Sequence, residues 1–219
     1  VFACIFRAFV PLPATAGPYA ALLVVGVASQ EGFRLGLHWT HKKMTVALQQ
    51  LAASMGLPPL TRTDQRELAL GHGMGHGFAH SIFFFVSFLQ LAAGDGTYYL
   101  PTCPSISFFV ATALNSLAFL LLHSFSMVVA FEGLTTRQPL LAGMAPALHM
   151  TAALLTLGNF RMDGCLWVIP TNLALAVVPA AMAARIVWRG AKHDTPLTLP
   201  EGGSSAGDAV TQPLAAGDE

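Results

Sequence analysis

Apolar side chains fill long runs of this chain that few charged residues interrupt. Residues 1 to about 17 are apolar but broken by prolines, so they predict only a fragment of a helix. Five runs then follow, at about 18–41, 68–93, 108–131, 140–157 and 165–187. Each is close to the about 20 residues that a helix needs to cross the hydrocarbon core of a bilayer. The pattern therefore predicts an all-α, polytopic membrane helix bundle with five complete spans and an N-terminal fragment.

The polar segments between these runs set the domain boundaries. Residues 42–66 form the longest connection, and Leu57-Pro58-Pro59-Leu60 marks a loop within it. From Arg189 onward Gly, Pro, Ser, Ala and acidic residues dominate, a composition typical of disorder. We therefore expect a helix bundle over residues 1–188 and a disordered tail over residues 189–219.

Basic residues predict the orientation of the bundle. Lysine and arginine occur in the 42–66 connection and at the end of the last run, whereas the turn Gly94-Asp95-Gly96 has neither. Because cytoplasmic loops are enriched in lysine and arginine, that connection and the tail are predicted to be cytoplasmic. The turns that contain Asp95 and Asp163 then face the lumen.

The overall composition agrees with a membrane protein. Charged residues make up 10% of the chain, whereas a soluble domain has about a quarter. The formal net charge is zero, so there is no electrostatic reason to expect nucleic-acid binding. The three cysteines, Cys4, Cys103 and Cys165, show no spacing typical of a disulfide framework or a metal site, and we expect buried or lumenal thiols.

The glycine-rich stretch from Gly71 to Ser81 lies inside the second long run. Gly73, Gly77 and Ser81 are spaced four residues apart, so they share one face of a helix. Small residues at this spacing let two membrane helices approach closely. The stretch therefore predicts a packing groove for another helix.

Four residues on different predicted helices share a common depth: Glu31, Gly77, His123 and His149 each lie roughly 15 to 17 Å from the cytoplasmic edge, at about 1.5 Å per residue. Ionisable side chains there need partners, because inserting Asp, Arg or Lys costs about 2.5 to 3.5 kcal/mol. Arg34 follows Glu31 by three positions and can pair with it. His123 and His149 lie on consecutive antiparallel helices and can meet. Interhelical hydrogen bonds, worth about 0.6 to 2 kcal/mol each, are the expected role.

Several short motifs, taken together, resemble one protein family. They are Gln30-Glu31-Gly32-Phe33-Arg34 followed by Lys42-Lys43, the groove Gly73, Gly77 and Ser81, Gly94-Asp95 with Tyr98-Tyr99, Leu121-Leu122-His123-Ser124-Phe125, His149 at 26 residues from His123, and Leu157-Gly158-Asn159. In this order they resemble the anterior-pharynx-defective (Aph) subunit family of gamma-secretase, the intramembrane protease complex. The resemblance covers about residues 18–188.

This resemblance implies a seven-helix, non-catalytic scaffold subunit that supports presenilin assembly and the cleavage of Notch-type membrane substrates. Its implied partners are presenilin, nicastrin, the remaining small gamma-secretase subunit and the lipid bilayer. It implies a multi-pass protein of the endoplasmic reticulum, Golgi and plasma membrane with a cytoplasmic C-terminal tail, and it implies neither cofactor nor metal.

The resemblance also implies roles for individual residues. Gly73 and Gly77, with Ser81 in place of a third glycine, serve helix packing and assembly, and His123 and His149 face the presenilin side. The family has a longer N-terminal part that supplies most of a first helix and all of a second, and it lacks residues 100–108. These two departures predict a partial or mispredicted gene product, or a divergent paralogue.

One alternative function is an intramembrane glutamic protease related to the CAAX-type prenyl endopeptidases. Glu31 with Arg34 nearly matches the acidic motif of that family, and Phe119-x-x-x-His123 matches its second motif. A glutamate that activates water needs an orienting shell, but Ala153 replaces the amide expected four residues after His149.

A second alternative is a histidine-rich membrane protein that binds a metal ion or haem. His72, His76 and His80 share one helix face, and His123 with His149 form another possible pair. No acid or cysteine accompanies the row of three, so polar packing inside the bundle is the simpler interpretation of these histidines.

Overall fold

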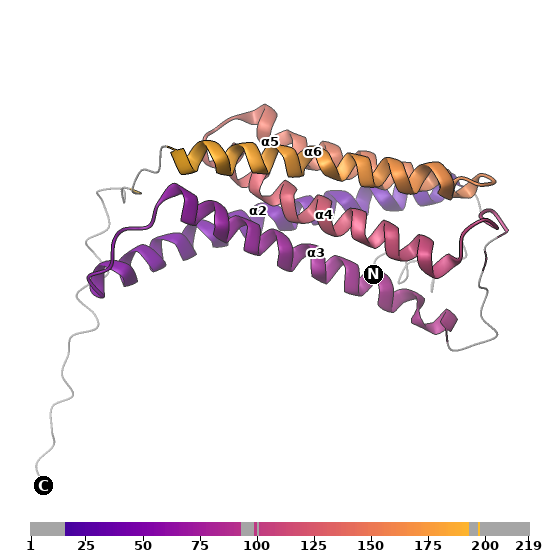
Figure 1. The fold of residues 1–219 in the computed structure, drawn as a ribbon, viewed down its shortest axis with the longest axis horizontal. Helices are drawn as coiled ribbons and strands as arrows, with labels where there is room; N and C mark the ends of the chain where they lie inside the picture. Colours follow the sequence, from indigo (N-terminus) through magenta and orange to yellow (C-terminus); the bar gives the residue numbers. More distant parts are fainter. Residues whose placement is uncertain (1–15, 93–98, 100, 193–196, 198–219) are drawn as a thin grey trace, which may run out of the picture.

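The computed structural model describes residues 16–92, 99, 101–192 and 197, and it describes no side chain of residues 85–92 and 191–192. The described residues form α2 (Ala16–Ser54), α3 (Arg62–Ala92), α4 (Phe108–Thr135), α5 (Pro139–Leu155), the 3-10 helix η1 (Thr156–Phe160) and α6 (Cys165–Lys192). These helices run along one long axis and form a bundle, without a strand in the described part of the chain (Figure 1). The predicted all-α helix bundle is confirmed.

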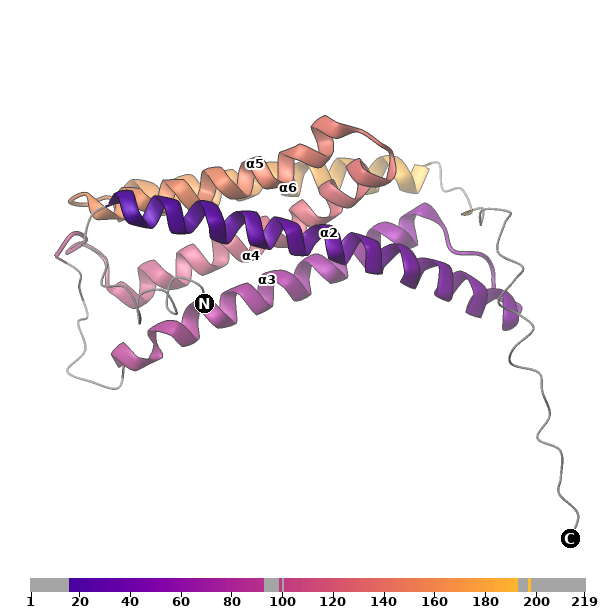
Figure 2. The ribbon, with the colours of Figure 1, turned by 180° about the vertical axis from the view of Figure 1, so that it is seen from behind.

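Helix α4 is the centre of the bundle, and α3, α5 and α6 all contact it. One hydrophobic cluster joins all four helices, because the stretch Met127 to Phe131 of α4 packs against Ala69, Ala145 and Ala183. Figure 2 shows α2 on the outside of this core, where it lies along α5 and crosses α3. A polar group on the inner face of α2 can therefore reach the core helices.

Four of the described helical segments are long and apolar enough to cross a membrane, namely Ala16–Ser54, Phe108–Thr135, Pro139–Phe160 and Cys165–Gly190. The remaining predicted span forms α3, which packs against α4 along the same axis. The histidines and glycines of this helix are concentrated between Gly71 and His80. The described part of the chain thus contains four apolar spans, with α3 packed beside them.

Helix α2 is longer than the sequence pattern predicted. We expected it to end near Lys42 and Lys43, but it continues to Ser54. The charges do not interrupt a helix, whereas Gly56 does, since it adopts a left-handed conformation (φ 66°) two residues before the first of the two prolines. Helix α3 then begins with a reciprocal cap in which Asp64 accepts from the backbone and hydroxyl of Thr61 at 2.7 and 2.9 Å.

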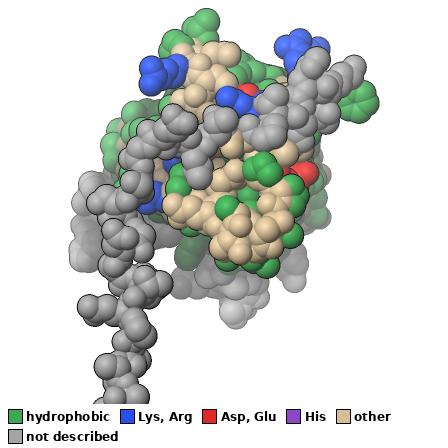
Figure 3. Space-filling view, turned by 90° about the vertical axis from the view of Figure 1, so that its left-hand side faces the viewer, with side chains coloured by type: hydrophobic (Ala, Val, Ile, Leu, Met, Phe, Trp, Pro, Cys, Tyr) green, Lys and Arg blue, Asp and Glu red, His purple; other side chains and the backbone are tan. Residues whose placement is uncertain are grey.

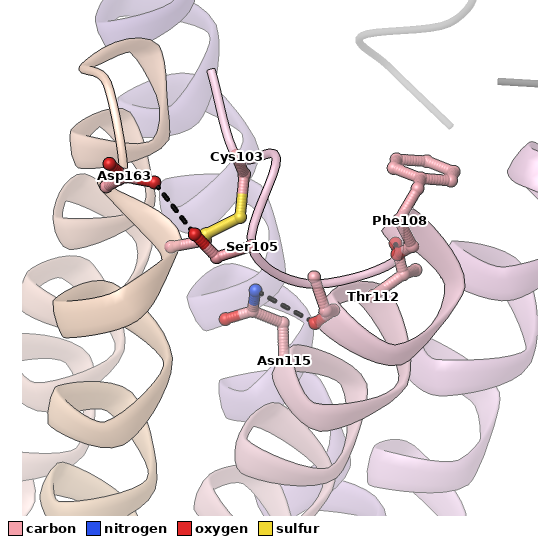
Figure 4. The surroundings of a disulfide bond; sticks show 8 residues. Cys103, Ser105, Phe108, Thr112, Asn115 and Asp163 are labelled. Carbon is pink, nitrogen blue, oxygen red and sulfur yellow. Dashed lines mark hydrogen bonds between the residues drawn. A yellow bond between two sulfur atoms is a disulfide. The ribbon is translucent and has the colours of Figure 1, made fainter. Parts of the chain in front are cut away.

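A disulfide joins Cys103 to Cys165, so the expectation of unpaired thiols at these positions was wrong (Figure 4). The loop before α4 folds back onto the start of α6, where Asp163 donates its backbone N–H to the Thr102 carbonyl at 2.8 Å and accepts from Ser105 at 3.2 Å. The sequence concealed this pairing because 62 residues separate the cysteines.

The predicted tail lies mostly outside the described residues. Helix α6 continues to Lys192, and Leu197 is the single described residue beyond it. At this end of the bundle Lys and Arg side chains stand at the rim (Figure 3). The N-terminal fragment, residues 1–15, also lies outside the described part.

Candidate functional site

A polar cluster lies inside the bundle, and its first members come from α2. Arg34 is buried, with 3% of its side chain exposed, and donates from Nη1 to Glu31 Oε2 at 2.6 Å. The other carboxylate oxygen, Oε1, lies 2.7 Å from Nδ1 of His149 on α5. Both oxygens of Glu31 thus have a protein partner, and one carboxylate links two helices.

Arg34 also reaches α4. Its Nη2 lies 3.4 Å from both Nδ1 of His123 and Oγ of Ser126. Because arginine has only donors, Nδ1 of His123 accepts, and the proton of the neutral ring is on Nε2. The His149 ring differs, since its Nδ1 carries the proton that it donates to Glu31. The two histidines are therefore distinguished by their α2 partners.

The imidazole rings of the cluster pack against one another. The centroids of His123 and His149 are 4.5 Å apart at nearly a right angle. From α3, the rings of His76 and His80 lie 4.8 and 4.7 Å from His123. Four helices thus place their polar side chains around His123, which is fully buried.

This cluster has spare hydrogen-bonding capacity. The nitrogens His76 Nε2, His80 Nδ1 and His123 Nε2 are buried and have no hydrogen-bond partner among the described residues. A polar atom buried in this way raises the free energy of the folded state, because it gives up its hydrogen bonds to water without replacing them. The described residues nevertheless contain no group of three histidine, cysteine or acidic side chains that could hold a metal ion.

The three histidines of α3 lie in two different parts of the bundle. His72 binds the Leu68 carbonyl through Nδ1 at 2.7 Å, and its ring lies 5.4 Å from that of His41 on α2. His76 and His80 instead join the cluster around His123. The three histidines do not form one site, which removes the geometric basis of the metal or haem alternative for this row.

The small residues of α3 face α4. A Cβ atom on Gly73 would meet the Ser124 carbonyl oxygen and, at 2.9 Å, the Cβ of Met127. A Cβ on Gly77 would lie 2.8 Å from the Leu120 carbonyl oxygen, and Ser81 donates its hydroxyl to the Ser116 carbonyl at 3.3 Å. This face of α3 thus lies against the α4 backbone.

The sequence pattern missed several residues of these contacts. Ser126, His76 and His80 were not placed near His123, although His76 and His80 precede the groove positions by one residue and so lie on the adjoining face of the same helix. The bidentate ion pair of Arg66 with Glu132, at 3.1 and 2.8 Å, was also missed. No spacing in the sequence relates these last two residues, which come from α3 and α4.

Known proteins resemble this chain over half of its length or more. It is 37% identical over 186 residues to "Gamma-secretase subunit APH1-like" of Arabidopsis thaliana, which covers 84% of this chain and 74% of that relative. It is 33% identical over 156 residues to "Gamma-secretase subunit Aph-1b" of Danio rerio, covering 71% of this chain and 58% of that relative. For "Gamma-secretase subunit APH-1B" of Homo sapiens the identity is 33% over 109 residues, which are 50% of this chain and 40% of the relative.

No solved structure matches the chain. The match to the family described as "Aph-1 protein" extends over residues 1–190, which include α2 to α5, all but the last two residues of α6, and all the members of the polar cluster. Together with the identity to the plant and fish relatives, this match shows that the chain belongs to the Aph-1 family.

Proposed function

We propose that this chain is a non-catalytic scaffold subunit of a gamma-secretase complex. Its role is to support presenilin assembly together with nicastrin and the remaining small subunit, so that presenilin cleaves Notch-type membrane substrates. Membership of the Aph-1 family supports the proposal, as do the relatives named as gamma-secretase subunits. The complex resides in the membranes of the endoplasmic reticulum, the Golgi and the cell surface, and the C-terminal tail is cytoplasmic.

The contact between α3 and α4 is the structural observation that carries this proposal. Gly73 and Gly77 let two helices meet at backbone distance, and this contact places His76 and His80 beside His123. The helix pair thus holds the polar cluster in a fixed arrangement. A rigid core of this kind suits a subunit whose task is to hold other membrane helices in place.

Replacing Gly73 by leucine tests the assembly role. The new side chain would meet the Ser124 carbonyl, so α3 has to move away from α4, and we expect loss of co-purification with presenilin and nicastrin. Gly75→Leu is the matched control, because a Cβ on Gly75 meets nothing within 4 Å. Both variants are expressed in cells that lack the endogenous subunit. Unimpaired complex formation by Gly73→Leu would refute the role of this contact.

The contact between Glu31 and His149 keeps the glutamic-protease alternative open to test. Against catalysis, both oxygens of Glu31 already have protein partners, Arg34 and His149. We expect His123→Ala to weaken assembly or presenilin maturation. Loss of proteolytic activity by His123→Ala in a complex that assembles normally would instead favour a chemical role for the cluster.

A further inference from the structure

Gln49 joins three segments of the chain at one end of the bundle. It lies near the end of α2 and is buried, with 7% of its surface exposed. Its side-chain oxygen accepts from the Leu60 N–H at 2.8 Å, and its Nε2 donates to the Leu197 carbonyl at 3.3 Å. The Leu197 N–H in turn donates to the Leu60 carbonyl at 2.9 Å. The side-chain amide of Gln49 thus hydrogen-bonds both to the loop between α2 and α3 and to Leu197.

The bonds to Leu197 follow the pattern by which proteins bind extended peptides. Its N–H pairs with a backbone carbonyl and its carbonyl accepts from a side-chain amide, so the tail adds to the loop as a short strand would. Both bonds use main-chain atoms of Leu197. They therefore fix the path of the chain, while neighbouring side chains supply the selectivity.

An apolar groove begins at the same loop. It has a volume of about 760 Å³ and lies between the end of α2 and the start of α3. Its apolar walls include Leu51, Met55, Leu57 and Leu60, of which Met55 and Leu57 are 63% and 53% exposed. This end lies beyond the predicted membrane span of α2, where an open apolar surface of this size marks a binding site.

We propose that the C-terminal tail of this chain occupies this groove as an extended strap, with residues 197–200 against the loop and Gln49 as the residue that holds it. Leu197 is already bonded to Leu60, one of the groove residues, and 22 further residues of this chain begin at that point. The segment Leu197-Thr198-Leu199-Pro200 supplies apolar side chains of the size that the groove takes. A partner segment that uses the groove must displace the strap. This inference does not depend on the proposed function.

A cysteine pair at positions 60 and 197 tests the strap in the full-length protein. In a Cys4→Ser background, Leu60→Cys with Leu197→Cys is oxidised in membranes, and mass spectrometry quantifies the linked peptides. The backbone bond between the two positions brings the sulfur atoms within reach of each other. The control pair is Leu60→Cys with Ala206→Cys. We expect efficient linkage of the first pair only, and equal linkage of the two pairs would overturn the proposal.

Variants of Gln49 test the residue that holds the strap. Gln49→Glu keeps the oxygen that accepts from Leu60 but loses the donor to Leu197, so linkage should fall roughly two- to tenfold, the ratio that corresponds to one lost hydrogen bond. The neighbouring Gln50→Ala, at an exposed position, should leave linkage unchanged. Unchanged elution of each variant from a gel-filtration column excludes misfolding. Linkage that is insensitive to Gln49→Glu would contradict the proposal.

Two further outcomes separate the strap from other occupants. Leu199→Asp should lower the linkage, whereas Leu214→Asp, farther along the tail, should not. Linkage that yields mainly a species of twice the mass would show that the tail of a second copy fills the groove, and would overturn the intramolecular strap.

Discussion

Glu31 links the polar side chains of α2 to those of α5. Its carboxylate neutralises Arg34 on its own helix and holds the ring of His149 on α5. Arg34 is buried and has its ion pair with Glu31, so removing the carboxylate would leave a positive charge inside the bundle without its counter-ion. Removing one member of the pair should therefore cost more free energy of folding than the intact pair contributes.

A double-mutant cycle on this pair measures that effect. Glu31→Ala should destabilise the protein strongly, by about 3 to 5 kcal/mol, because it leaves the buried Arg34 without its counter-ion. Arg34→Ala should cost less, since Glu31 keeps its contact with His149. The double variant should be less destabilised than the sum of the two single variants. Thermal unfolding of the purified protein in detergent measures all four stabilities. Additive effects would mean that the two side chains do not depend on each other.

Gly133 occupies a position at the end of α4 where no side chain fits. A Cβ there would meet the backbone nitrogen of Ala142 on α5 and lie 2.9 Å from the Cα of that residue. Alanine for glycine within a helix ordinarily stabilises by roughly 0.5 to 1 kcal/mol, but Gly133→Ala should destabilise because the α5 backbone must shift. Gly143→Ala on α5 is the control, since its Cβ meets nothing within 4 Å, and it should be neutral or stabilising. If Gly133→Ala and Gly143→Ala shifted the melting temperature in the same direction, this interpretation would be refuted.

At the scale of elements, the sequence predicted the helices well because the apolar runs of a membrane protein are long. The ends were less predictable. The charges at Lys42 and Lys43 mark where we predicted α2 to leave the lipid, whereas the helix itself continues to Ser54 and stops before Gly56. A helix can continue into water, so the membrane boundary and the helix boundary are different physical quantities.

The disulfide between the loop before α4 and the start of α6 should contribute measurably to stability. Closing a long loop covalently is worth about 2 to 4 kcal/mol, mainly by restricting the unfolded chain. We expect Cys103→Ser to lower the melting temperature, and a reducing agent to lower that of the wild type to the same value. The variant itself should be insensitive to reduction, and Cys4→Ser should behave as the wild type. A wild type that reduction leaves unchanged would contradict this expectation.

At the scale of the whole molecule, the polar cluster could be predicted in part. Counting residues from the predicted loops placed Glu31, His123 and His149 at one depth, and the structure brings these three together. Counting residues could not place His76 and His80, because the rotation of α3 about its axis depends on how closely Gly73 and Gly77 approach α4. The depth of a residue follows from counting along its own helix, whereas the rotation of that helix about its axis follows from contacts with other helices.

The proposed orientation of the bundle can be tested with two single substitutions that create glycosylation acceptors. Asp95→Asn gives Asn-Gly-Thr in the loop proposed to be lumenal, and Pro59→Asn gives Asn-Leu-Thr in the loop proposed to be cytoplasmic. Only the first should be glycosylated in microsomes, and a tag on the tail should be removed by protease added outside. Glycosylation of Pro59→Asn with a protected tail would reverse the orientation.

The bond between Cys103 and Cys165 has a consequence for the biosynthesis of the protein. The bond can form only after both cysteines have been synthesised, so Cys103 is a free thiol until Cys165 follows it. The 62 residues between the cysteines take on the order of 3 to 12 s to synthesise at roughly 5 to 20 residues per second. During this interval α4 and α5 are made while the thiol is free to react with other thiols. A premature reaction with another thiol would leave Cys165 without its partner and the loop before α4 untied from the start of α6.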